Sequence, residues 1–339
     1  MAGESTLTTP QVLRLLGAGA TGAILMSLGG EGLLRTKELT ERVRGYTPRT
    51  VYRYAGKLTE LGVIEREEEP GVPSKVVHSL SEPCGRELYE LLDAYAQASL
   101  TRMSGGEIDA HAWGSLSLLA DLWESGMIEA LNLGPRSPTE LARGDHGLSY
   151  HQVNRRAGLF AIGGFVRETS VGGKRRSYEL TEKARRGMAL IAGVGRWRRR
   201  HIVPQGTAGL TPREAGGVLR TSLPLVALPE HAGKSLGFEI AGESMEGGEG
   251  DAVWANVKDN GIVLSCEGPL PEVDGLARAR VATIVDSLLD GPSRNGFSSE
   301  GDEGLIKTCL ERLHSTLWVA WPDDSAAAAE AMAGGGDGA

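Results

Sequence analysis

Residues 47–66 read TPRTVYRYAGKLTELGVIER, and residues 149–168 read SYHQVNRRAGLFAIGGFVRE, at an offset of 102. A valine, an arginine, an alanine-glycine pair and a second glycine occupy the same positions in both stretches, with no gap. In each stretch a threonine or serine precedes a helical pattern, and a glycine ends that pattern before a run of strand-forming residues. The two stretches therefore predict one helix-turn-strand unit that occurs twice in the chain.

The features around both stretches also follow one order. An apolar helical stretch comes first, then a short capped helix, the quoted helix, two short strands and a final helix. In the first copy the apolar helix is expected at 11–28, the short helix after a cap at Thr36 and the quoted helix after a cap at Thr47. The two strands are expected at 63–66 and 75–80, and the final helix at 83–100. In the second copy they are expected at 113–131, after caps at Ser137 and Ser149, at 165–168 and 175–180, and after Thr181.

This order of elements is that of a winged helix-turn-helix. From GAILMSLGG at 22–30 to HSLSEPCGRELYELL at 78–92, the first copy resembles the HxlR and MarR classes of bacterial winged-helix transcriptional regulators. The second copy, from LADLWESGM at 119–127 to ARRGMALI at 184–191, is similar to them as well. The predicted fold is mainly α with small β wings: two tandem winged helix-turn-helix domains, at 8–104 and 105–203, followed by an α+β domain.

The resemblance implies that the quoted helix of each copy lies in the major groove of DNA, where its N-terminal residues reach base edges. Glutamine and asparagine suit adenine and arginine suits guanine, so the second copy has an inventory for base readout. Its expected DNA contacts are Tyr150, His151, Gln152, Asn154, Arg155 and Arg156 on the helix and Lys174, Arg175 and Arg176 on the wing. Those of the first copy are Arg49, Thr50, Tyr52, Arg53 and Lys57. Arg198–Arg200, at the end of the last helix, either contact phosphate or complement the helix dipole.

Charge divides the chain into unlike parts. The formal net charge of −8 consists of −1 over residues 1–105, +5 over 106–204 and −12 over 205–339. It therefore excludes only a generally basic DNA binder, and DNA binding is expected mainly within residues 136–200. In the first copy the acidic run Glu65–Glu69 falls on the wing, where it repels phosphate. That copy either contacts DNA through its helix or keeps the fold to pair with the second copy.

The last third of the chain has a different pattern. A capping box at Thr211 predicts a helix to Ser222, and strands are expected at 236–241, 252–257 and 262–267, with one more near 296–299. Helices at 281–289 and 303–318 complete an α+β domain at 208–322, and a disordered tail is expected at 323–339.

The segments AVWANV, GIVLSCEG, ATIVDSLLDG and GDEGLIKTCLERLHSTLW of this domain resemble, in that order, sterol-carrier-protein-like domains. The resemblance implies an apolar ligand cavity. The candidates for its lining are Phe238, Trp254, Cys266 and Trp318. Aromatic residues on strands also occur as plain core, so both interpretations stay open.

Other motifs do not indicate catalysis. GAGATG at 17–22 satisfies the dinucleotide pattern G-x-G-x-x-G, but no strand precedes it, and Gly233–Ser235 lacks the first glycine of a P-loop. No histidine lies in an H-E-x-x-H pair, and Cys84, Cys266 and Cys309 have neither metal-site nor disulfide spacing. We expect no cofactor, no metal and no enzymatic activity.

These observations predict a sequence-specific bacterial transcriptional regulator that binds double-stranded DNA at an imperfect palindrome, as a pseudo-dimer within one chain or as a homodimer. An apolar small molecule is its expected effector. No apolar run reaches the ~20 residues of a membrane span, and MAGESTLTTP is not a signal peptide, so the expected location is the cytoplasm, in association with the nucleoid.

Three alternatives remain. In the first, a ligand-binding or carrier protein uses winged helices as protein-protein interaction modules. The second is an enzyme with a winged-helix dimerisation domain, against which the lack of a glycine-rich cofactor loop in the last third argues. The third is a nonspecific architectural DNA binder, which the negative net charge disfavours.

Overall fold

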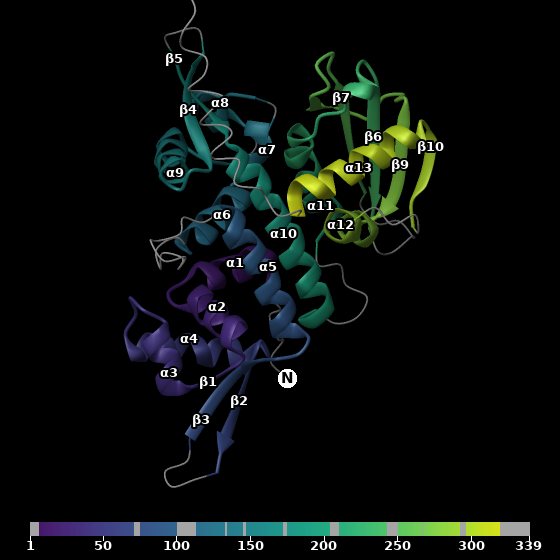
Figure 1. Cartoon of the computed structure of the whole chain (residues 1–339). Helices are drawn as coiled ribbons and strands as arrows, with labels where there is room; N and C mark the ends of the chain where they lie inside the picture. The colour runs from purple at the N-terminus through teal and green to yellow at the C-terminus, as the bar shows by residue number, and fades with distance from the viewer. Residues whose placement is uncertain are drawn as a thin grey trace, which may run out of the picture.

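The structure, a computed structural model, describes residues 7–70, 75–99, 113–132, 134–144, 147–171, 175–203, 210–242, 250–266, 268–291 and 296–318. We divide them into three segments: the first runs from α1 to α5, the second from α6 to α10 and the third from α11 to α13 (Figure 1). The chain is rich in helices and has small sheets, which is consistent with a winged helix-turn-helix architecture.

The first segment contains α1 (Thr9–Gly17), α2 (Thr21–Glu31), β1 (Leu33–Arg35), α3 (Thr36–Arg42), α4 (Pro48–Glu60), β2 (Ile64–Glu69), β3 (Lys75–Leu80) and α5 (Cys84–Ser99). Its antiparallel sheet has the order β1-β3-β2, and we call the β2–β3 hairpin the first wing. The sequence did not predict β1, and its prediction of a cap at Thr36 is wrong. Arg35 is the cap residue of α3: its backbone N–H donates to Glu38 Oε2 at 2.8 Å, while the Thr36 hydroxyl donates to the Val76 carbonyl at 3.2 Å.

The second segment repeats this order of helices and strands. It contains α6 (Gly114–Glu124), α7 (Met127–Asn132), α8 (Pro138–Arg143), α9 (Tyr150–Ile162), β4 (Val166–Val171), β5 (Arg175–Leu180) and α10 (Glu182–His201). We call the antiparallel β4–β5 pair the second wing. An isolated bridge between Arg136 and Tyr178 stands where β1 pairs with β3 in the first segment, there through Leu34 and His78.

The two segments share a hydrogen-bonded junction between wing and final helix. The Ser81 hydroxyl donates to the Gly62 carbonyl at 2.5 Å, and the Thr181 hydroxyl donates to the Gly164 carbonyl at 2.7 Å. Both glycines adopt a positive φ, 70° and 74°, a conformation that glycine reaches at little cost. The same side-chain contact therefore closes the same turn in both segments.

Two stretches that the sequence predicts as single helices are each divided. Residues 11–28 form α1 and α2, which meet at an angle of 80° around Gly19, whose φ is 55°. Residues 113–131 form α6 and α7, with Gly126 at a φ of 67° between them. Within the described residues, no single helix has the length and hydropathy to cross a membrane, and α1 and α2 meet that criterion only as a bent pair.

The first two segments pack through α1 against α6 and through α5 against α10. The glycines of GAGATG allow this close approach. A Cβ on Gly17 would lie 2.7 Å from the Ser117 backbone nitrogen, and one on Gly22 would lie 2.4 Å from the Trp113 ring. The side chain of Arg14 forms ion pairs across the same contact, at 2.6 Å with Asp121 and also with Glu124.

The third segment contains α11 (Pro212–Ser222), β6 (Ser235–Ala241), β7 (Asp251–Val257), β8 (Val263–Cys266), β9 (Gly275–Arg280), α12 (Val281–Asp290), β10 (Ser298–Gly301) and α13 (Glu303–Trp318), with short 3-10 turns at Leu223–Leu225 and Pro229–His231. Its sheet has the order β10-β9-β6-β7-β8, in which only β6 and β9 are parallel. The sequence did not predict β9. The expected tail at 323–339 lies outside the described residues.

Candidate nucleic-acid interface

The helix α4 displays cations on its exposed face. The Thr47 hydroxyl accepts a hydrogen bond from the Thr50 backbone N–H at 3.3 Å, which with Pro48 fixes the start of the helix. Val51, Ala55 and Leu58 are buried in the core, so the opposite face is open to solvent. That face carries four of the five residues that the sequence predicts as DNA contacts, Arg49, Tyr52, Arg53 and Lys57, all exposed, and Thr50 is half-buried.

The helix α9, like α4, has one face buried in the core and the opposite face exposed to solvent. A capping box starts it: the Gln152 side-chain oxygen accepts from the Ser149 N–H at 2.8 Å, and the Ser149 hydroxyl accepts from the Gln152 N–H at 3.3 Å. Of the predicted contacts, Tyr150, His151, Gln152 and Arg155 are exposed, whereas Asn154 and Arg156 are half-buried. The Asn154 side-chain oxygen is itself buried and has no hydrogen-bond partner among the described residues. Arg155 and Tyr150 are therefore better placed for DNA than Asn154.

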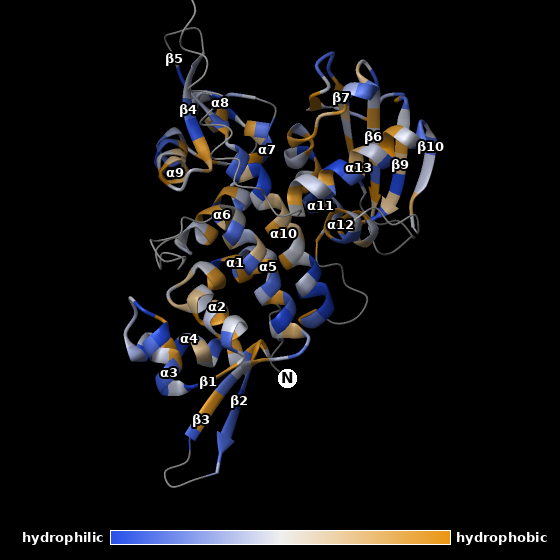
Figure 2. Cartoon of the chain, viewed as in Figure 1, coloured by the Kyte–Doolittle hydropathy of each residue, from blue (hydrophilic) through white to orange (hydrophobic). Residues whose placement is uncertain are grey.

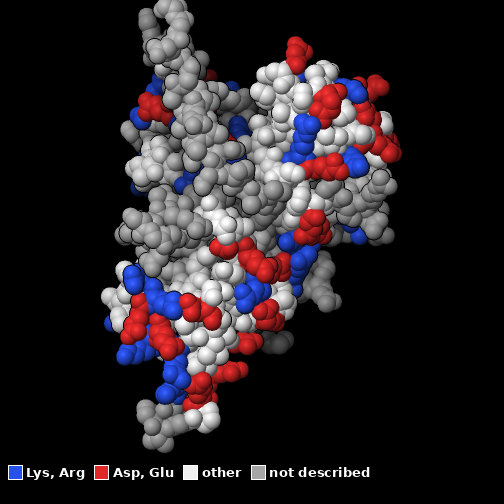
Figure 3. Space-filling model, in the orientation of Figure 1, with Lys and Arg blue, Asp and Glu red and all other residues white. Residues whose placement is uncertain are grey.

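The two wings differ in charge. In the first wing, β2 is hydrophilic along its length while β3 has a hydrophobic stretch (Figure 2), and Glu65, Glu67 and Glu68 are exposed. Acidic and basic side chains lie next to each other over the first segment in Figure 3. In the second wing Arg176 is exposed but pairs with Glu168 at 2.8 Å. Lys174 lies outside the described residues, and the side chain of Arg175 is outside them too.

The arrangement brings both helices to one side of the molecule. In Figure 1, α4 and α9 lie along the left side, the two wings extend to the bottom and the top, and the third segment lies on the right. The two helices that carry most of the predicted contacts therefore lie on one side, away from the third segment.

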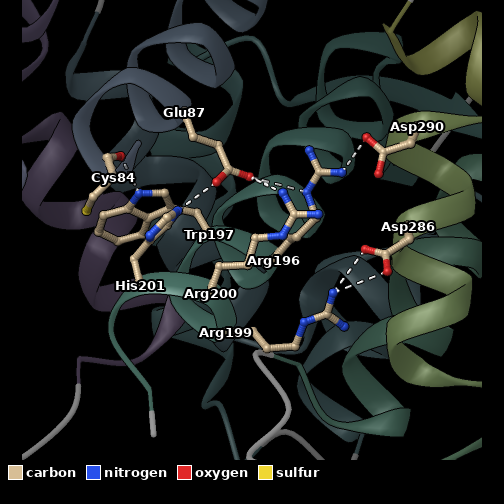
Figure 4. Close-up of polar contacts among 9 residues, drawn as sticks. All are labelled: Cys84, Glu87, Arg196, Trp197, Arg199, Arg200, His201, Asp286 and Asp290. Atoms are coloured by element: carbon tan, nitrogen blue, oxygen red, sulfur yellow. Dashed lines mark hydrogen bonds and ion pairs between the residues drawn. The ribbon is translucent and has the colours of Figure 1, made fainter. Parts of the chain in front are cut away.

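The cations at the end of α10 have carboxylate partners on other helices. Figure 4 shows Glu87 of α5 paired with three side chains of α10, Arg200 at 2.8 Å, His201 at 2.7 Å and Arg196 at 3.6 Å. The Trp197 indole N–H donates to the Cys84 carbonyl at 2.8 Å. These contacts tie α10 to the first segment.

Two further arginines of α10 reach the third segment. Arg196, 10% exposed, lies 2.6 Å from Asp290, and Arg199 lies 3.0 Å from Asp286, both on α12 (Figure 4). Arg198 donates to the Thr9 hydroxyl at 3.1 Å, and burial lowers its pKa. The charges that the sequence offers as phosphate contacts, Arg198–Arg200, thus join the three segments.

Two of the four residues proposed for the apolar cavity, Phe238 and Trp254, lie on opposite faces of the sheet. Phe238 pairs with Val253 in the sheet, and Gly237 pairs with Trp254, so the side chains of Phe238 and Trp254 project from opposite faces. Cys266 pairs with Trp254 and shares its face, while Phe238 is fully buried on the helix-covered face. The side chain of Trp318 lies outside the described residues. Phe238 is therefore a core residue.

A cleft of about 900 Å³ lies between the second and third segments, and Cys266 of the predicted set is among its lining residues. Its lining includes three arginines and three carboxylates, Arg136, Arg213, Arg220, Glu129, Glu140 and Asp251. Arg213 pairs with Glu129 at 3.2 Å, and Arg220 pairs with Asp251 at 2.5 Å. Across the described residues, no group of three histidine, cysteine, aspartate or glutamate side chains is placed to hold a metal ion.

The first segment is similar to a known family of proteins. Residues 15–103 match the model of the HxlR-like helix-turn-helix family. Among solved structures, that of diamide-treated YodB from B. subtilis is similar, with 25% sequence identity over 25% of this chain and 85% of that chain and a TM-score of 0.22. No curated protein matches the chain. The family match confirms the HxlR resemblance of residues 15–103 and indicates a DNA-binding transcriptional regulator.

Proposed function

We propose that the chain is a sequence-specific transcriptional regulator in which the first and second segments are tandem winged helix-turn-helix domains. The observation that carries the proposal is the placement of α4 and α9, whose exposed faces bear Arg53 and Arg155, along one side of the molecule. The repeated junction at Ser81 and Thr181 and the repeated bridge between strands support it. In this proposal the chain binds DNA and catalyses no reaction.

The two domains form a pseudo-dimer within one chain, in the manner of symmetric winged-helix dimers. Recognition helices in such dimers read half-sites about 34 Å apart, one turn of DNA. At the offset of 102, Arg53 corresponds to Arg155, whereas Lys57 corresponds to Leu159. The operator is therefore an imperfect palindrome, with one guanine contact common to both half-sites and different bases elsewhere.

Binding to genomic fragments tests the proposal. Arg53→Ala and Arg155→Ala should each weaken binding to the selected fragment by about 1–3 kcal/mol, or about 5- to 150-fold, measured by fluorescence anisotropy over a salt series. Lys258→Ala is the matched control, because Lys258 is an exposed cation of the third segment. The proposal fails if the chain selects no fragment, or if both arginine variants bind as the control does.

The alternative, a ligand-binding protein whose winged helices bind other proteins, predicts no selected fragment. Ligand control of DNA binding is part of our proposal, with the cleft between the second and third segments as the site. Arg136 lines it and has no ion-pair partner among the described residues, so we expect an anionic ligand rather than an apolar one. A ligand there would contact α8, which packs on α9.

A further inference from the structure

We infer that Tyr54 is a positioning residue of the proposed DNA interface: its ring orients Arg53 and Lys57 and connects α4 to the turn between α1 and α2. The inference rests on the proposed function and names a residue that the pattern of exposed side chains does not reveal. Tyr54 is half-buried, on the side of α4 that turns toward the core. In the proposed complex Tyr54 does not itself contact DNA.

The ring of Tyr54 lies under two cations of the exposed face. The guanidinium carbon of Arg53 is 4.8 Å from the ring centroid, and the ammonium nitrogen of Lys57 is 5.3 Å from it. Both distances are within the range of a cation–π interaction. Long cationic side chains lose rotamer freedom when they bind DNA, so a ring that restricts them in advance reduces that loss.

The ring is in turn fixed by a glycine outside α4. Gly19 has a φ of 55°, and a Cβ at that position would lie 2.3 Å from Cε2 of Tyr54. Only a residue without a side chain lets the ring approach the α1–α2 turn so closely. The position of the Tyr54 ring is therefore set by the backbone of the turn.

The same turn contacts the second segment. Gly17 and Gly22, on either side of it, lie against Ser117 of α6 and the ring of Trp113, the cap residue of α6. The glycine motif at 17–22 thus touches the Tyr54 ring through its centre and the second segment through its ends. Through this turn, the ring aligns the cations of α4 with the segment that carries α9.

The second segment has no equivalent arrangement among its described residues. Arg156 corresponds to Tyr54 at the offset of 102, and the cation–π pairs among the described residues include neither Arg155 nor Arg156. The contribution of the ring is therefore confined to the first half-site.

A pair of variants of the full chain tests the inference. Tyr54→Phe keeps the ring and should bind the fragment selected by the wild type with unchanged affinity. Tyr54→Leu removes the ring, so Arg53 and Lys57 must lose their rotamer freedom on binding, which should weaken binding about tenfold and flatten the salt dependence. If Tyr54→Leu loses the native melting transition, Tyr54→Met is used in its place.

A double-mutant comparison separates positioning from a merely structural role. In the Arg53→Ala, Lys57→Ala background, Tyr54→Leu should cause little further loss of affinity, because no cations remain to be oriented. An equal loss in both backgrounds overturns the inference. So does wild-type affinity for Tyr54→Leu.

Tyr89→Leu is the matched control. Tyr89 is also half-buried, with Arg86 at 5.6 Å over its ring and Gly29 against its edge, but it lies on α5. It should leave DNA affinity unchanged. If Arg53→Ala weakens binding while Tyr54→Leu does not, only the inference fails, whereas a wild-type chain that binds no fragment refutes both it and the proposed function.

Discussion

Replacing Glu87 with glutamine should loosen the attachment of α10 to the first segment. The Glu87 carboxylate, 17% exposed, accepts from Arg200 at 2.8 Å and from His201 at 2.7 Å. It also lies 3.6 Å from Arg196, which is too far for a hydrogen bond and adds little to the sum. Arg200 is 43% exposed, so its ion pair is worth less than about 1 kcal/mol. The contact with His201, which is 14% exposed, is worth about 1–2 kcal/mol as a charge-assisted hydrogen bond. Together the loss is about 2 kcal/mol.

This loss is measurable by thermal unfolding followed by circular dichroism. For a cooperative unit of 150–250 residues, about 1 kcal/mol shifts the midpoint by about 2–4 °C, so Glu87→Gln should lower the midpoint by about 4–8 °C. Glu90→Gln, an exposed glutamate on the same helix, is the control and should melt as the wild type does. Equal midpoints for the two variants would show that Glu87 does not hold α10 in place.

Two further predictions concern stability. Gly22→Ala should destabilise the chain by about 1–3 kcal/mol in urea unfolding, because a Cβ there would lie 2.4 Å from the Trp113 ring. Gly30→Ala in the same helix is the control and should not destabilise it, because a Cβ there has no atom within 4 Å. Similar unfolding midpoints for the two variants would refute the packing argument. Burial lowers the pKa of His78, so the unfolded chain binds the proton more readily, and stability should fall as the pH drops below about 6.5. His78→Gln should reduce that fall, as measured by melting at several pH values; an unchanged pH profile would contradict it.

The sequence predicts the starts of α4 and α9, since capping is local. The capping residues of α4 and α9 lie three residues from the groups that they bind, and Thr47 and Ser149 are caps as expected. The contact between the turn at Gly19, which divides the first helical stretch, and the Tyr54 ring joins residues that are distant in sequence, so the sequence did not reveal it. The strand β9, LARAR after Gly275, alternates small and charged residues, and without its neighbours it carries no hydrophobic signal.

In the candidate nucleic-acid interface, too, local features could be predicted from the sequence and contacts between distant residues could not. The exposed face of α4 follows from helical periodicity, because Val51, Ala55 and Leu58 mark the buried side. The partners of the basic end of α10 could not be inferred from sequence, since Glu87 is 113 residues from Arg200 and Asp286 is 87 residues from Arg199. The placement of Phe238 and Trp254 on opposite faces of the sheet could not be inferred either, because it depends on the register of two strands.

The proposed fusion of two recognition helices in one chain has a physical consequence. In a homodimer every substitution appears in both half-sites, whereas here Arg53 and Arg155 stay alike while Tyr54 and Arg156 differ. The covalent link also replaces a bimolecular association by an intramolecular one, so the pair does not depend on chain concentration. Because α10 packs against α1 and α5 on one side and α11 and α12 on the other, a shift of the third segment would act on the packing between the two domains. Because the two recognition helices differ, the proposed operator is asymmetric, and the chain binds it in one orientation.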